Sequence, residues 1–355
     1  MTPILSNNYF IFFNNEAYEA LNKYIHSKRP SIIFLLVDEN THEHCLPIVL
    51  QQIETKTIIE IIEIEAGEKF KNIETCSGVW NALTELGCDR KSLIINVGGG
   101  VITDLGGFVA STFKRGIDFV NIPTTLLSMV DASVGGKTGI DLGVLKNQIG
   151  LFSNPELVVI DPQFLKTISK RELISGLAEI IKYGLTYDIH IWNEIMSYKE
   201  FNTNNLSSLI HRSIEIKNEV VLKDPKEAGL RKILNFGHTL GHAIESYFLE
   251  NDLKDNLTHG EAIAIGMITE SFLSMKLKNF AEEKVALIKK IILNIYGSVN
   301  ISKEDYKPIM ELLIHDKKNV GGAVKFVLLN DFEKFNLDCE ASNKLIIEAL
   351  DYYNA

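Results

Sequence analysis

Short apolar runs and helix-like segments alternate along the first half of the chain. Five apolar runs have the length of strands, at residues 32–37, 57–64, 93–97, 119–122 and 157–160. Segments with helical spacing lie between several of them, at residues 41–55, 72–86 and 101–112. Such dense apolar runs fit strands that are buried on both faces. The alternation of strand and helix predicts an α/β domain whose parallel sheet is covered by helices.

The pattern changes after about residue 170, where long helical stretches follow one another. They cover residues 171–187, 206–223, 236–248, 260–278, 281–296 and 341–353, and only residues 324–329 have the apolar run of a strand. This half of the chain is therefore predicted to be mainly α-helical. We expect an α/β domain at residues 1–168 and a helical domain at residues 169–355.

The composition narrows the range of partners. The chain has 355 residues, 46% of them hydrophobic, and 46 acidic against 36 basic side chains give a formal charge of −10. This apolar content excludes disorder as the main state. The acidic excess argues against a general nucleic-acid binder. It does not exclude a small anionic ligand, because a few lysines in one place create a local positive field.

Cysteine usage and the absence of long apolar stretches favour a cytoplasmic protein without a membrane partner. The four cysteines are scattered and form no CxxC pair, so we interpret them as reduced thiols. The N-terminal segment MTPILSNNYF lacks the basic start and apolar run of a signal peptide. No stretch of the sequence approaches the ~18 apolar residues of a membrane span.

The first candidate site is a glycine cluster in the segment LIINVGGGVITD, residues 93–104. An apolar strand ends in Gly98, Gly99 and Gly100, and a helix is predicted to begin at once. Glycine lets backbone amides approach a phosphate, and a helix N-terminus adds partial positive charge. The spacing is not GxGxxG. A phosphate or dinucleotide site and a simple tight turn both remain open.

The second candidate follows in IPTTLLSMVDASVGGKT, residues 122–138. Thr124 and Thr125 come after a strand and a proline, and Lys137 follows paired glycines. Lys146 and Asn147 lie a little further on. A lysine placed in this way can hold a ligand phosphate as a point charge. The segment does not match the P-loop pattern, and a solvated loop lysine is the alternative.

The third candidate combines histidines with a carboxylate. His238 and His242 are four residues apart and share one helix face, while His259 stands at the start of another helix. Glu179 lies among apolar neighbours on an earlier helix. Such a set can form a zinc site with an open position, although the spacing is not HExxH. The alternative is a pair of hydrogen-bonded histidines packed between helices.

Several cations accompany these groups: Arg115, Lys182, Lys217, Arg231 and Lys317. Lys182 follows Glu179 by three residues and should share its face. A single helix lysine is usually a solvated surface group. From the residues alone we therefore infer a nucleotide-binding α/β domain joined to a helical domain that has a candidate metal site.

Several separated motifs together resemble those of the 3-dehydroquinate synthases, within the sugar phosphate cyclase family. They are GEKFK at 67–71, GGGVITD at 98–104, FKRGIDFVNIPTTLLSMVDASVGGKTGID at 113–141, LKNQIG at 145–150, RELISGLAEIIKYG at 171–184, GLRKILNFGHTLGHAIE at 229–245, HGEAIAIGM at 259–267 and DKK at 316–318. The resemblance implies a Rossmann-like N-terminal α/β domain and a helical C-terminal domain that binds metal and substrate. One departure is Thr103, which stands where the family often has glycine.

The resemblance also implies a role for each matching residue. The metal, zinc or cobalt, would be bound by Glu179, His238 and His259, and His242 would instead lie near the substrate phosphate. NAD would contact Asp38, Glu68, Lys71, Gly99, Gly100, Val101, Asp104, Thr124, Thr125, Lys137, Lys146, Phe164 and Thr167. The catalytic residues would be His242, Lys137, Lys182, Asp131 and Asn235. The substrate would be held by Arg115, Lys137, Lys146, Asn147, Lys217, Arg231 and Lys317.

The implied activity is that of a phosphorus–oxygen lyase. It would convert 3-deoxy-D-arabino-heptulosonate 7-phosphate into 3-dehydroquinate and phosphate, with NAD regenerated in each cycle. The family residue that matches Arg115 reaches into the neighbouring subunit's site, which implies a homodimer. Another sugar phosphate cyclase is the nearest alternative. A metal-dependent polyol dehydrogenase is a weaker one, because it would not need this many cations.

Overall fold

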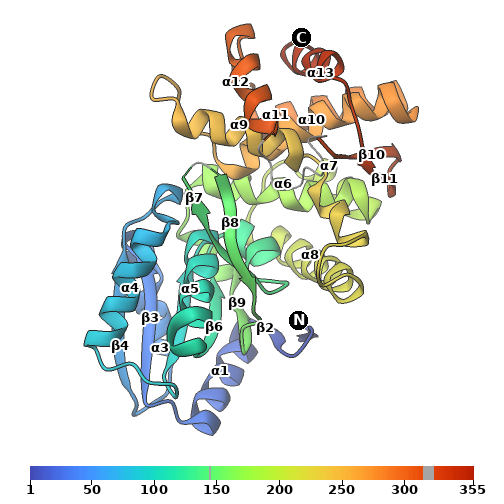
Figure 1. The fold of residues 1–355 in the computed structure, drawn as a ribbon. Helices are drawn as coiled ribbons and strands as arrows, with labels where there is room; N and C mark the ends of the chain where they lie inside the picture. Colours follow the sequence, from blue (N-terminus) through green and yellow to red (C-terminus); the bar gives the residue numbers. More distant parts are fainter. Residues whose placement is uncertain (144, 315–323) are drawn as a thin grey trace. The chain divides into compact units, whose positions relative to one another are not determined.

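The computed structural model describes residues 1–143, 145–314 and 324–355 (Figure 1). Its contacts divide the chain into two compact units. The first comprises Met1–Ser169 and Asn202–Leu222, and the second comprises Lys170–Phe201 and Lys223–Ala355. The helix α8 (Thr203–Lys223) lies beyond residue 168, yet it packs almost entirely with the first unit. Its Asn218 side chain donates a hydrogen bond to the carbonyl oxygen of Leu5 at 2.9 Å.

The first unit is built on a seven-stranded sheet. Its strands, in spatial order, are β1 (Ile4–Leu5), β2 (Phe10–Phe13), β9 (Leu157–Ile160), β6 (Asp118–Pro123), β5 (Leu93–Gly98), β3 (Ile32–Asp38) and β4 (Ile58–Ile64). All neighbouring strands from β2 to β4 are parallel, and β1 pairs antiparallel with β2. The five predicted strands and their parallel arrangement are confirmed. The short strands β1 and β2 were not predicted.

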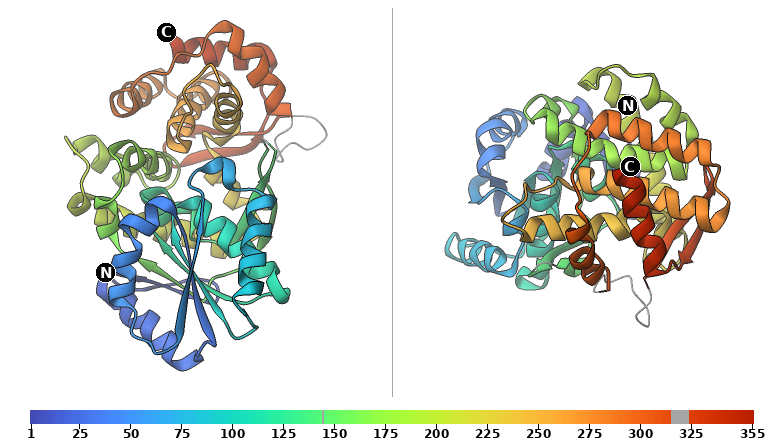
Figure 2. Two further views of the ribbon diagram at one scale, coloured as in Figure 1. Left: turned by 90° about the vertical axis from the view of Figure 1, so that its left-hand side faces the viewer. Right: turned by 90° about the horizontal axis from the view of Figure 1, so that it is seen from above.

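Helices cover both faces of this sheet, as the left view of Figure 2 shows. On one face α4 (Ile73–Glu85) and α5 (Gly100–Thr112) pack against the strands around a core that includes Phe34, Leu105 and Phe108. The helix α1 (Asn14–Lys28) packs against β2 and β9. The strands β3, β5, β6 and β9 therefore have side chains buried on both sides, as their dense apolar runs predicted, whereas the edge strand β4 is partly exposed.

Two details of the first unit differ from expectation. The helix predicted at residues 41–55 is broken into α2 (Glu39–His44) and α3 (Leu46–Gln52). Pro47, in the first turn of α3, cannot donate a backbone hydrogen bond and so favours a new helix start there. A hairpin of β7 (Lys137–Leu142) and β8 (Leu145–Phe152) was not predicted. Its polar, glycine-containing strands depend on pairing with each other rather than on an apolar pattern.

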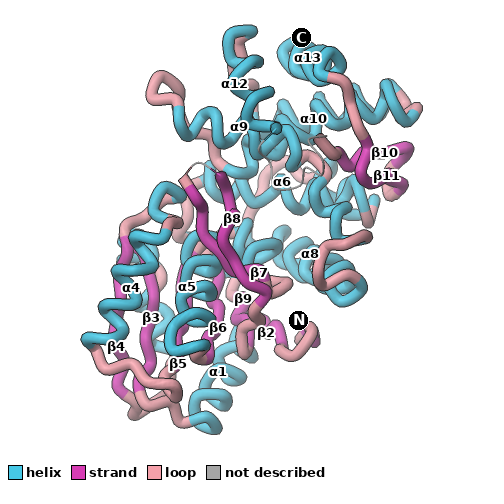
Figure 3. Tube along the Cα trace, in the orientation of Figure 1, coloured by secondary structure: helices cyan, strands magenta, loops and turns pink. Residues whose placement is uncertain are grey.

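The second unit is mainly helical, as expected (Figure 3). Its helices are α6 (Lys170–Thr186), α7 (Ile189–Ser197), α9 (His238–Glu250), α10 (His259–Lys278), α11 (Glu282–Tyr296), α12 (Lys303–Ile314) and α13 (Asn343–Asn354), with a short 3-10 segment η5 (Leu230–Asn235). A hairpin of β10 (Phe326–Asp331) and β11 (Lys334–Cys339) completes the unit. The helix α10 has buried residues all around its axis, as its apolar sequence requires. In the described part of the chain no helix is both long and apolar enough to cross a membrane.

Candidate active site

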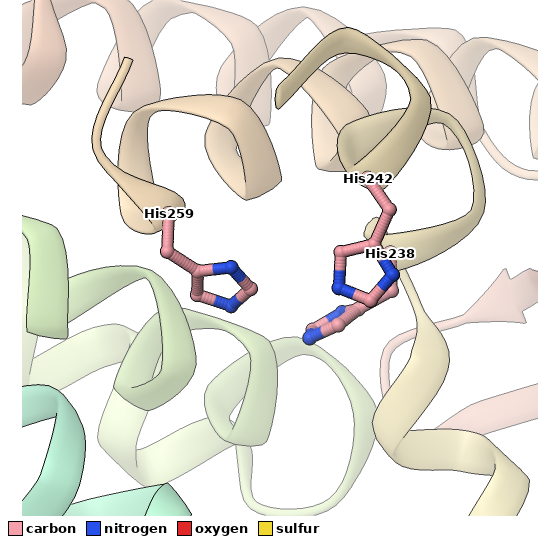
Figure 4. Close-up of side chains that lie close together, drawn as sticks. All are labelled: His238, His242 and His259. Atoms are coloured by element: carbon pink, nitrogen blue, oxygen red, sulfur yellow. The ribbon is translucent and has the colours of Figure 1, made fainter. Parts of the chain in front are cut away.

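Three histidines gather at the starts of two helices in the second unit. His238 and His242 project from α9 and His259 is the first residue of α10, and Figure 4 shows their rings pointing toward one another. The ring centroids lie 5.2 to 5.7 Å apart, and the ligand nitrogens all lie within 4.8 Å of one another. Imidazole nitrogen is an ordinary ligand of zinc and related ions. The predicted pair on α9 is thus joined by the third predicted histidine.

Glu179 brings a carboxylate to the same place. Its side chain is fully buried, and Oε1 lies 3.3 Å from Nε2 of His238 and 3.7 Å from Nε2 of His259. Two ligand atoms that share a tetrahedral zinc ion at about 2.1 Å would be ~3.4 Å apart. Within the described residues, Oε1 accepts no hydrogen bond. Glu179, His238 and His259 therefore have the spacing of ligands to one shared ion.

The other oxygen of Glu179 is engaged by Lys182. Nζ of Lys182 donates a hydrogen bond to Oε2, and only 1% of the lysine side chain is exposed. The alternative of a solvated helix lysine is therefore wrong for Lys182. In this part of α6 the polar residues are buried together with the apolar ones. Burial raises the pKa of Glu179, but Lys182 and His238 outweigh it and hold the pKa well below its ordinary value. The carboxylate stays charged.

Each of the two histidines nearest Glu179 is oriented through its other nitrogen. Nδ1 of His238 lies 3.2 Å from the carbonyl oxygen of Phe236, and Nδ1 of His259 lies 3.2 Å from Oε2 of Glu245. A carbonyl only accepts, so Nδ1 of His238 donates, and Nε2 is the nitrogen that faces Glu179. Carbonyl and carboxylate partners of this kind orient metal-binding histidines. The residues present therefore fit a divalent metal ion.

The electrostatics of the cluster favour a cation. Burial lowers the pKa of His259, but the carboxylates of Glu245 and Glu179 outweigh it and raise the pKa to about 9.

Glu245 was not singled out in the sequence, although it ends the segment GHTLGHAIE. Its position three residues after His242 gave no signal that it would contact the histidine of a different helix.

The start of α10 is fixed by local sequence. Oγ1 of Thr258 accepts from the backbone N–H of Glu261, and the Glu261 carboxylate accepts from the N–H of Thr258. Arg171 holds the same carboxylate with hydrogen bonds of 2.7 and 2.8 Å. This T-x-x-E capping box is visible in the sequence and identifies His259 as the first helical residue. The predicted start at residue 260 was late by one residue.

A close contact between helices sets His259 beside Glu179. A Cβ atom on Gly260 would lie 1.9 Å from the carbonyl oxygen of Ser175, so only glycine permits this approach. The N–H of Gly260 donates to Oγ of Ser175 at 3.0 Å. Ser175 lies about one turn before Glu179 on α6, so this contact aligns the start of α10 with the carboxylate.

The first unit has a second candidate site at the carboxyl edge of its sheet. The strand β3 has β4 on one side and β5 on the other, so the strand order reverses there. In open parallel sheets, ligands bind outside the carboxyl ends of the strands at such a point. Asp38 ends β3, and Gly98, Gly99 and Gly100 connect β5 to α5 at this edge. The predicted glycine segment thus forms a helix N-terminus, which suits a phosphate.

The two predicted threonines follow β6 at the same edge. The N–H of Thr124 donates to the carbonyl oxygen of Gly98 at 3.0 Å, and its hydroxyl is buried without a hydrogen-bond partner in the described part of the chain. The hydroxyl of Thr125 lies 2.9 Å from Oγ of Ser128. An unpartnered buried hydroxyl is costly, and a polar ligand would satisfy it. These residues fit a dinucleotide such as NAD.

A polar network involving Asp104 of α5 lies in the same unit. Lys71 is 3% exposed and donates to Oδ2 of Asp104 at 2.6 Å and to Oδ1 of Asn147 at 2.7 Å. Nζ of Lys146 donates to Oε1 of Glu68 at 3.0 Å. Burial lowers the pKa of Lys71, but Asp104 and Glu68 help to raise it above its ordinary value. The structure thus brings together five residues that were predicted to contact NAD or substrate.

Asp141 belongs to this network and was missed in the sequence. Its Oδ1 accepts from the N–H of Asn147 at 2.6 Å, and its own N–H donates to the carbonyl oxygen of Lys71 at 2.8 Å. Asn147 has φ of 51°, a left-handed conformation that asparagine tolerates better than most residues. Asp141 therefore holds Asn147 where its amide meets Lys71. The pairing of β7 with β8 creates this contact, and no local signal predicted it.

Other predicted cofactor contacts have structural partners of their own. Oδ1 of Asp38 caps α2 by accepting from the N–H of Thr41 at 2.8 Å. Val101 lies half-buried in the first turn of α5. The side chain of Phe164 is fully buried, which leaves its backbone as the part that could contact a ligand. Thr167 donates to the carbonyl oxygen of Phe164 at 2.7 Å.

The predicted substrate-binding residues of the first unit do not all lie together. Nζ of Lys217 donates to Oδ1 of Asp131 at 2.7 Å and also to the carbonyl oxygen of the same residue. Lys137 is exposed at the start of β7. Arg115 is exposed in a turn and has φ of 69°. Lys217 and Asp131 are thus brought into contact.

The remaining substrate candidates belong to the second unit or lie outside the described residues. Arg231 is 2% exposed, and its guanidinium donates to the carbonyl oxygen of Pro225 at 2.9 Å. The amide of Asn235 donates to Oε1 of Glu227 at 2.7 Å. Lys317 lies outside the described residues.

Comparisons with known proteins find two matching family models and a similar curated protein. Residues 61–175 match the family model of the 3-dehydroquinate synthase N-terminal domain, and residues 176–319 match that of the C-terminal domain. The chain is 41% identical over 336 residues to the 3-dehydroquinate synthase of Parabacteroides distasonis, covering 94% of each chain.

Solved structures share the fold. A 2-deoxy-scyllo-inosose synthase in complex with carbaglucose-6-phosphate, NAD+ and Co2+ superposes with a TM-score of 0.84 at 24% identity, covering 98% of this chain and 99% of that one. The 2-epi-5-epi-valiolone synthase of Streptomyces hygroscopicus with NAD+ and Zn2+ bound has a TM-score of 0.83 at 23% identity, covering 100% of this chain and 99% of that one.

Proposed function

Because the chain belongs to the 3-dehydroquinate synthase family, we propose that it converts 3-deoxy-D-arabino-heptulosonate 7-phosphate into 3-dehydroquinate and phosphate. The observation that carries this proposal is the convergence of Glu179, His238 and His259, with Lys182 paired to the same carboxylate. A catalytic metal site needs few protein ligands and an open coordination position. Three such ligands leave that position for the substrate.

The two cofactors have separate places in this proposal. Glu179, His238 and His259 would hold the divalent metal, and the glycine segment with Thr124 and the Lys71 network would hold NAD. When bound, the metal supplies Lewis acidity toward a substrate hydroxyl, and NAD supplies reversible hydride acceptance. In this assignment residues 1–168 form the NAD-binding domain, and residues 169–355 form the metal- and substrate-binding domain.

The chain's own residues would fix and neutralise the doubly anionic substrate. Arg231 suits its carboxylate, because a guanidinium presents two parallel donors. Lys137 and Lys146 suit its phosphate as point charges, with Asn147, Lys217 and Lys317 as further contacts. Holding both anionic ends selects one reactive conformer, and such orientation contributes on the order of 7–11 kcal/mol at best.

His242 would act at the substrate phosphate rather than as a metal ligand. It lies one turn after His238 and is half-buried, and an imidazole ring can carry a proton on either nitrogen. It can therefore hold a proton against the departing phosphate. Lys182, Asp131 and Asn235 would complete the catalytic set. Lys182 would keep Glu179 charged, because it pairs with Oε2 of that residue.

We further propose a cytoplasmic homodimer in which Arg115 reaches the partner's site. The exposed position of Arg115 in a turn supports such a reach. The four cysteines are free and buried, as is usual for a protein of a reducing compartment.

The decisive experiment incubates the purified protein with the seven-carbon acid phosphate, NAD and zinc. We expect phosphate release, a new carbocyclic product and no net NADH. Net NADH without phosphate release would indicate a polyol dehydrogenase and overturn the proposal. The Glu179→Gln variant serves as the control, because it keeps the side-chain volume and removes the proposed ligand's charge.

A further inference from the structure

The helix that carries His238 and His242 lacks a side-chain cap of its own. The residue before α9 is Gly237, which has φ of 81° and no side chain to accept a hydrogen bond from the first turn. The first N–H groups of a helix have no partner within the helix and need one from elsewhere. A buried helix start without such a partner would be free to fray, and His238 is its first residue.

Glu270 of the neighbouring helix α10 supplies the missing acceptors. Its Oε2 accepts from the N–H of Gly237 at 2.7 Å, and its Oε1 accepts from the N–H of Thr239 at 3.1 Å and of Leu240 at 3.3 Å. Glu270 is fully buried. A carboxylate at a helix N-terminus is favoured by both its hydrogen bonds and the helix dipole, and burial strengthens these interactions.

The backbones of α9 and α10 approach closely at this point. A Cβ atom on Gly266 would lie 1.8 Å from the carbonyl oxygen of Gly237, and a Cβ on Gly237 would lie 2.6 Å from Cγ of Met267. Glu270 lies one turn after Gly266 on the same helix. The short carboxylate therefore reaches the start of α9 only because the two helices are in direct contact.

We infer that Glu270 is a positioning residue for the metal site, acting through the first turn of α9. Of the two histidines proposed as metal ligands, His238 begins α9 and His259 begins α10. A carboxylate of α10 that binds the start of α9 therefore fixes the position of His238 relative to His259. Nε2 of His238 then keeps its place 3.3 Å from Glu179 before any ion binds. This inference rests on the proposed metal site and adds a residue outside the predicted set.

The test compares cobalt(II) binding by the full-length Glu270→Gln variant with that of the parent protein. Glutamine keeps the side-chain volume but turns one acceptor into a donor that faces an N–H group. We expect the dissociation constant for Co2+ to rise at least about tenfold, the usual effect of losing a residue that orients metal ligands. The visible absorption band of bound Co2+ should also shift, because the position of His238 relaxes.

Ser274→Ala is the matched control. Ser274 lies one turn further along α10. Its hydroxyl accepts from the N–H of Leu329 at 2.9 Å and donates to the backbone carbonyl oxygen of Glu270 at 2.7 Å, so its loss removes two buried hydrogen bonds but leaves the Glu270 carboxylate in place. We expect this variant to be less stable yet to bind Co2+ as the parent does. Equal weakening in both variants, or parental binding by Glu270→Gln, would overturn the role of Glu270. Failure of the parent protein to bind Co2+ or Zn2+ would overturn the proposed metal site itself.

Hydrogen exchange in the metal-free parent protein gives an answer that does not depend on how the variants fold. We expect the amides of Gly237, Thr239 and Leu240 to be as protected as the interior of α9, because Glu270 already holds them. Free exchange of these three amides would contradict the inference.

Discussion

Nε2 of His238 lies 3.3 Å from Oε1 of Glu179, a fully buried oxygen that accepts no hydrogen bond within the described residues. Nδ1 of the same ring faces the carbonyl oxygen of Phe236, so Nε2 is the nitrogen that remains on the side of the carboxylate. Both atoms are ordinary zinc ligands, and two ligands of one tetrahedral zinc ion would lie ~3.4 Å apart. The relationship therefore identifies the atoms that a metal ion would join.

Replacing the histidines one at a time should distinguish those that bind the metal from one that only lies near it. We expect His238→Ala and His259→Ala to lose bound zinc and activity together, because Nε2 of each ring lies within 3.7 Å of Oε1 of Glu179. His242→Ala should retain zinc while its turnover falls at least about a hundredfold, the range for a lost proton-transfer group. Elemental analysis of the purified variants makes the measurement. Stoichiometric zinc in His238→Ala, or its loss from His242→Ala, would reverse the assignment.

Lys182→Met should destabilise the metal-free protein strongly. The substitution leaves the charge of Glu179 buried without its partner, which typically costs about 3–5 kcal/mol. Bound zinc should restore part of this loss, because it places positive charge on the same carboxylate. Denaturant unfolding of the second unit with and without zinc measures both effects. Lys344→Met is the control, since Lys344 is 88% exposed and 3.9 Å from Glu348. An equal response of the two variants would show that the buried pair contributes little.

Lys137→Ala should cripple turnover while leaving NAD binding nearly intact. Lys137 is exposed at the start of β7 and is proposed to contact the substrate phosphate. Lys137 is only one of the residues expected to contact NAD, and the Lys71 network is proposed to hold the cofactor in the variant as well. Loss of one phosphate contact should reduce kcat/KM by at least about tenfold, since hydrogen bonds to charged groups contribute about 1.5–3 kcal/mol. Titration with NAD measures cofactor binding, and steady-state kinetics measure turnover, so the two parts of the prediction are checked separately. Unchanged turnover would remove Lys137 from the substrate site.

Asp305 should give the second unit a stability that depends on pH. It is 3% exposed, and it accepts hydrogen bonds from Tyr247 and from the N–H of Ser302, both at 2.6 Å. Burial raises its pKa, but Lys254, Tyr247 and Ser302 outweigh it and lower the pKa below its ordinary value. Asp305→Asn should reduce the free energy of unfolding at pH 7 by about 1.5–3 kcal/mol.

The sign of this pH dependence follows from linkage. A carboxyl group whose pKa is lower in the folded state stabilises the fold above its unfolded pKa of about 3.9 and loses that contribution as the pH falls through the folded pKa. The difference between Asp305→Asn and the parent protein should therefore shrink below about pH 4. Glu304 is an exposed neighbour of Asp305 on α12, and the stability difference between Glu304→Gln and the parent protein should not change in this way with pH. Unfolding curves collected from pH 3 to pH 7 measure the difference in stability between Asp305→Asn and the parent protein. A difference that stays constant over this range would contradict the prediction.

Much of the fold could be read from local sequence, because it depends on periodicity and short-range chemistry. The run at 93–97 followed by three glycines predicted β5 and α5 to within one residue of their bounds. The T-x-x-E spacing at Thr258 is typical of a helix N-terminus and indicates that α10 begins at His259, although the predicted start was one residue late. The hairpin of β7 and β8 could not be found in the same way. Its polar strands depend on pairing with one another, and this pairing positions Asn147 against Lys71.

The sequence by itself determined the family, the kinds of donor atoms and the segments that carry them, because motifs and periodic patterns are properties of neighbouring residues. Only the tertiary structure decided which of those atoms meet. It buries Lys182, although a single helix lysine is usually a solvated surface group, and it joins α8 to the first unit. It also brings Glu270 to the start of a helix that lacks its own cap. Burial and contacts across distant segments result from packing, and no local pattern records them.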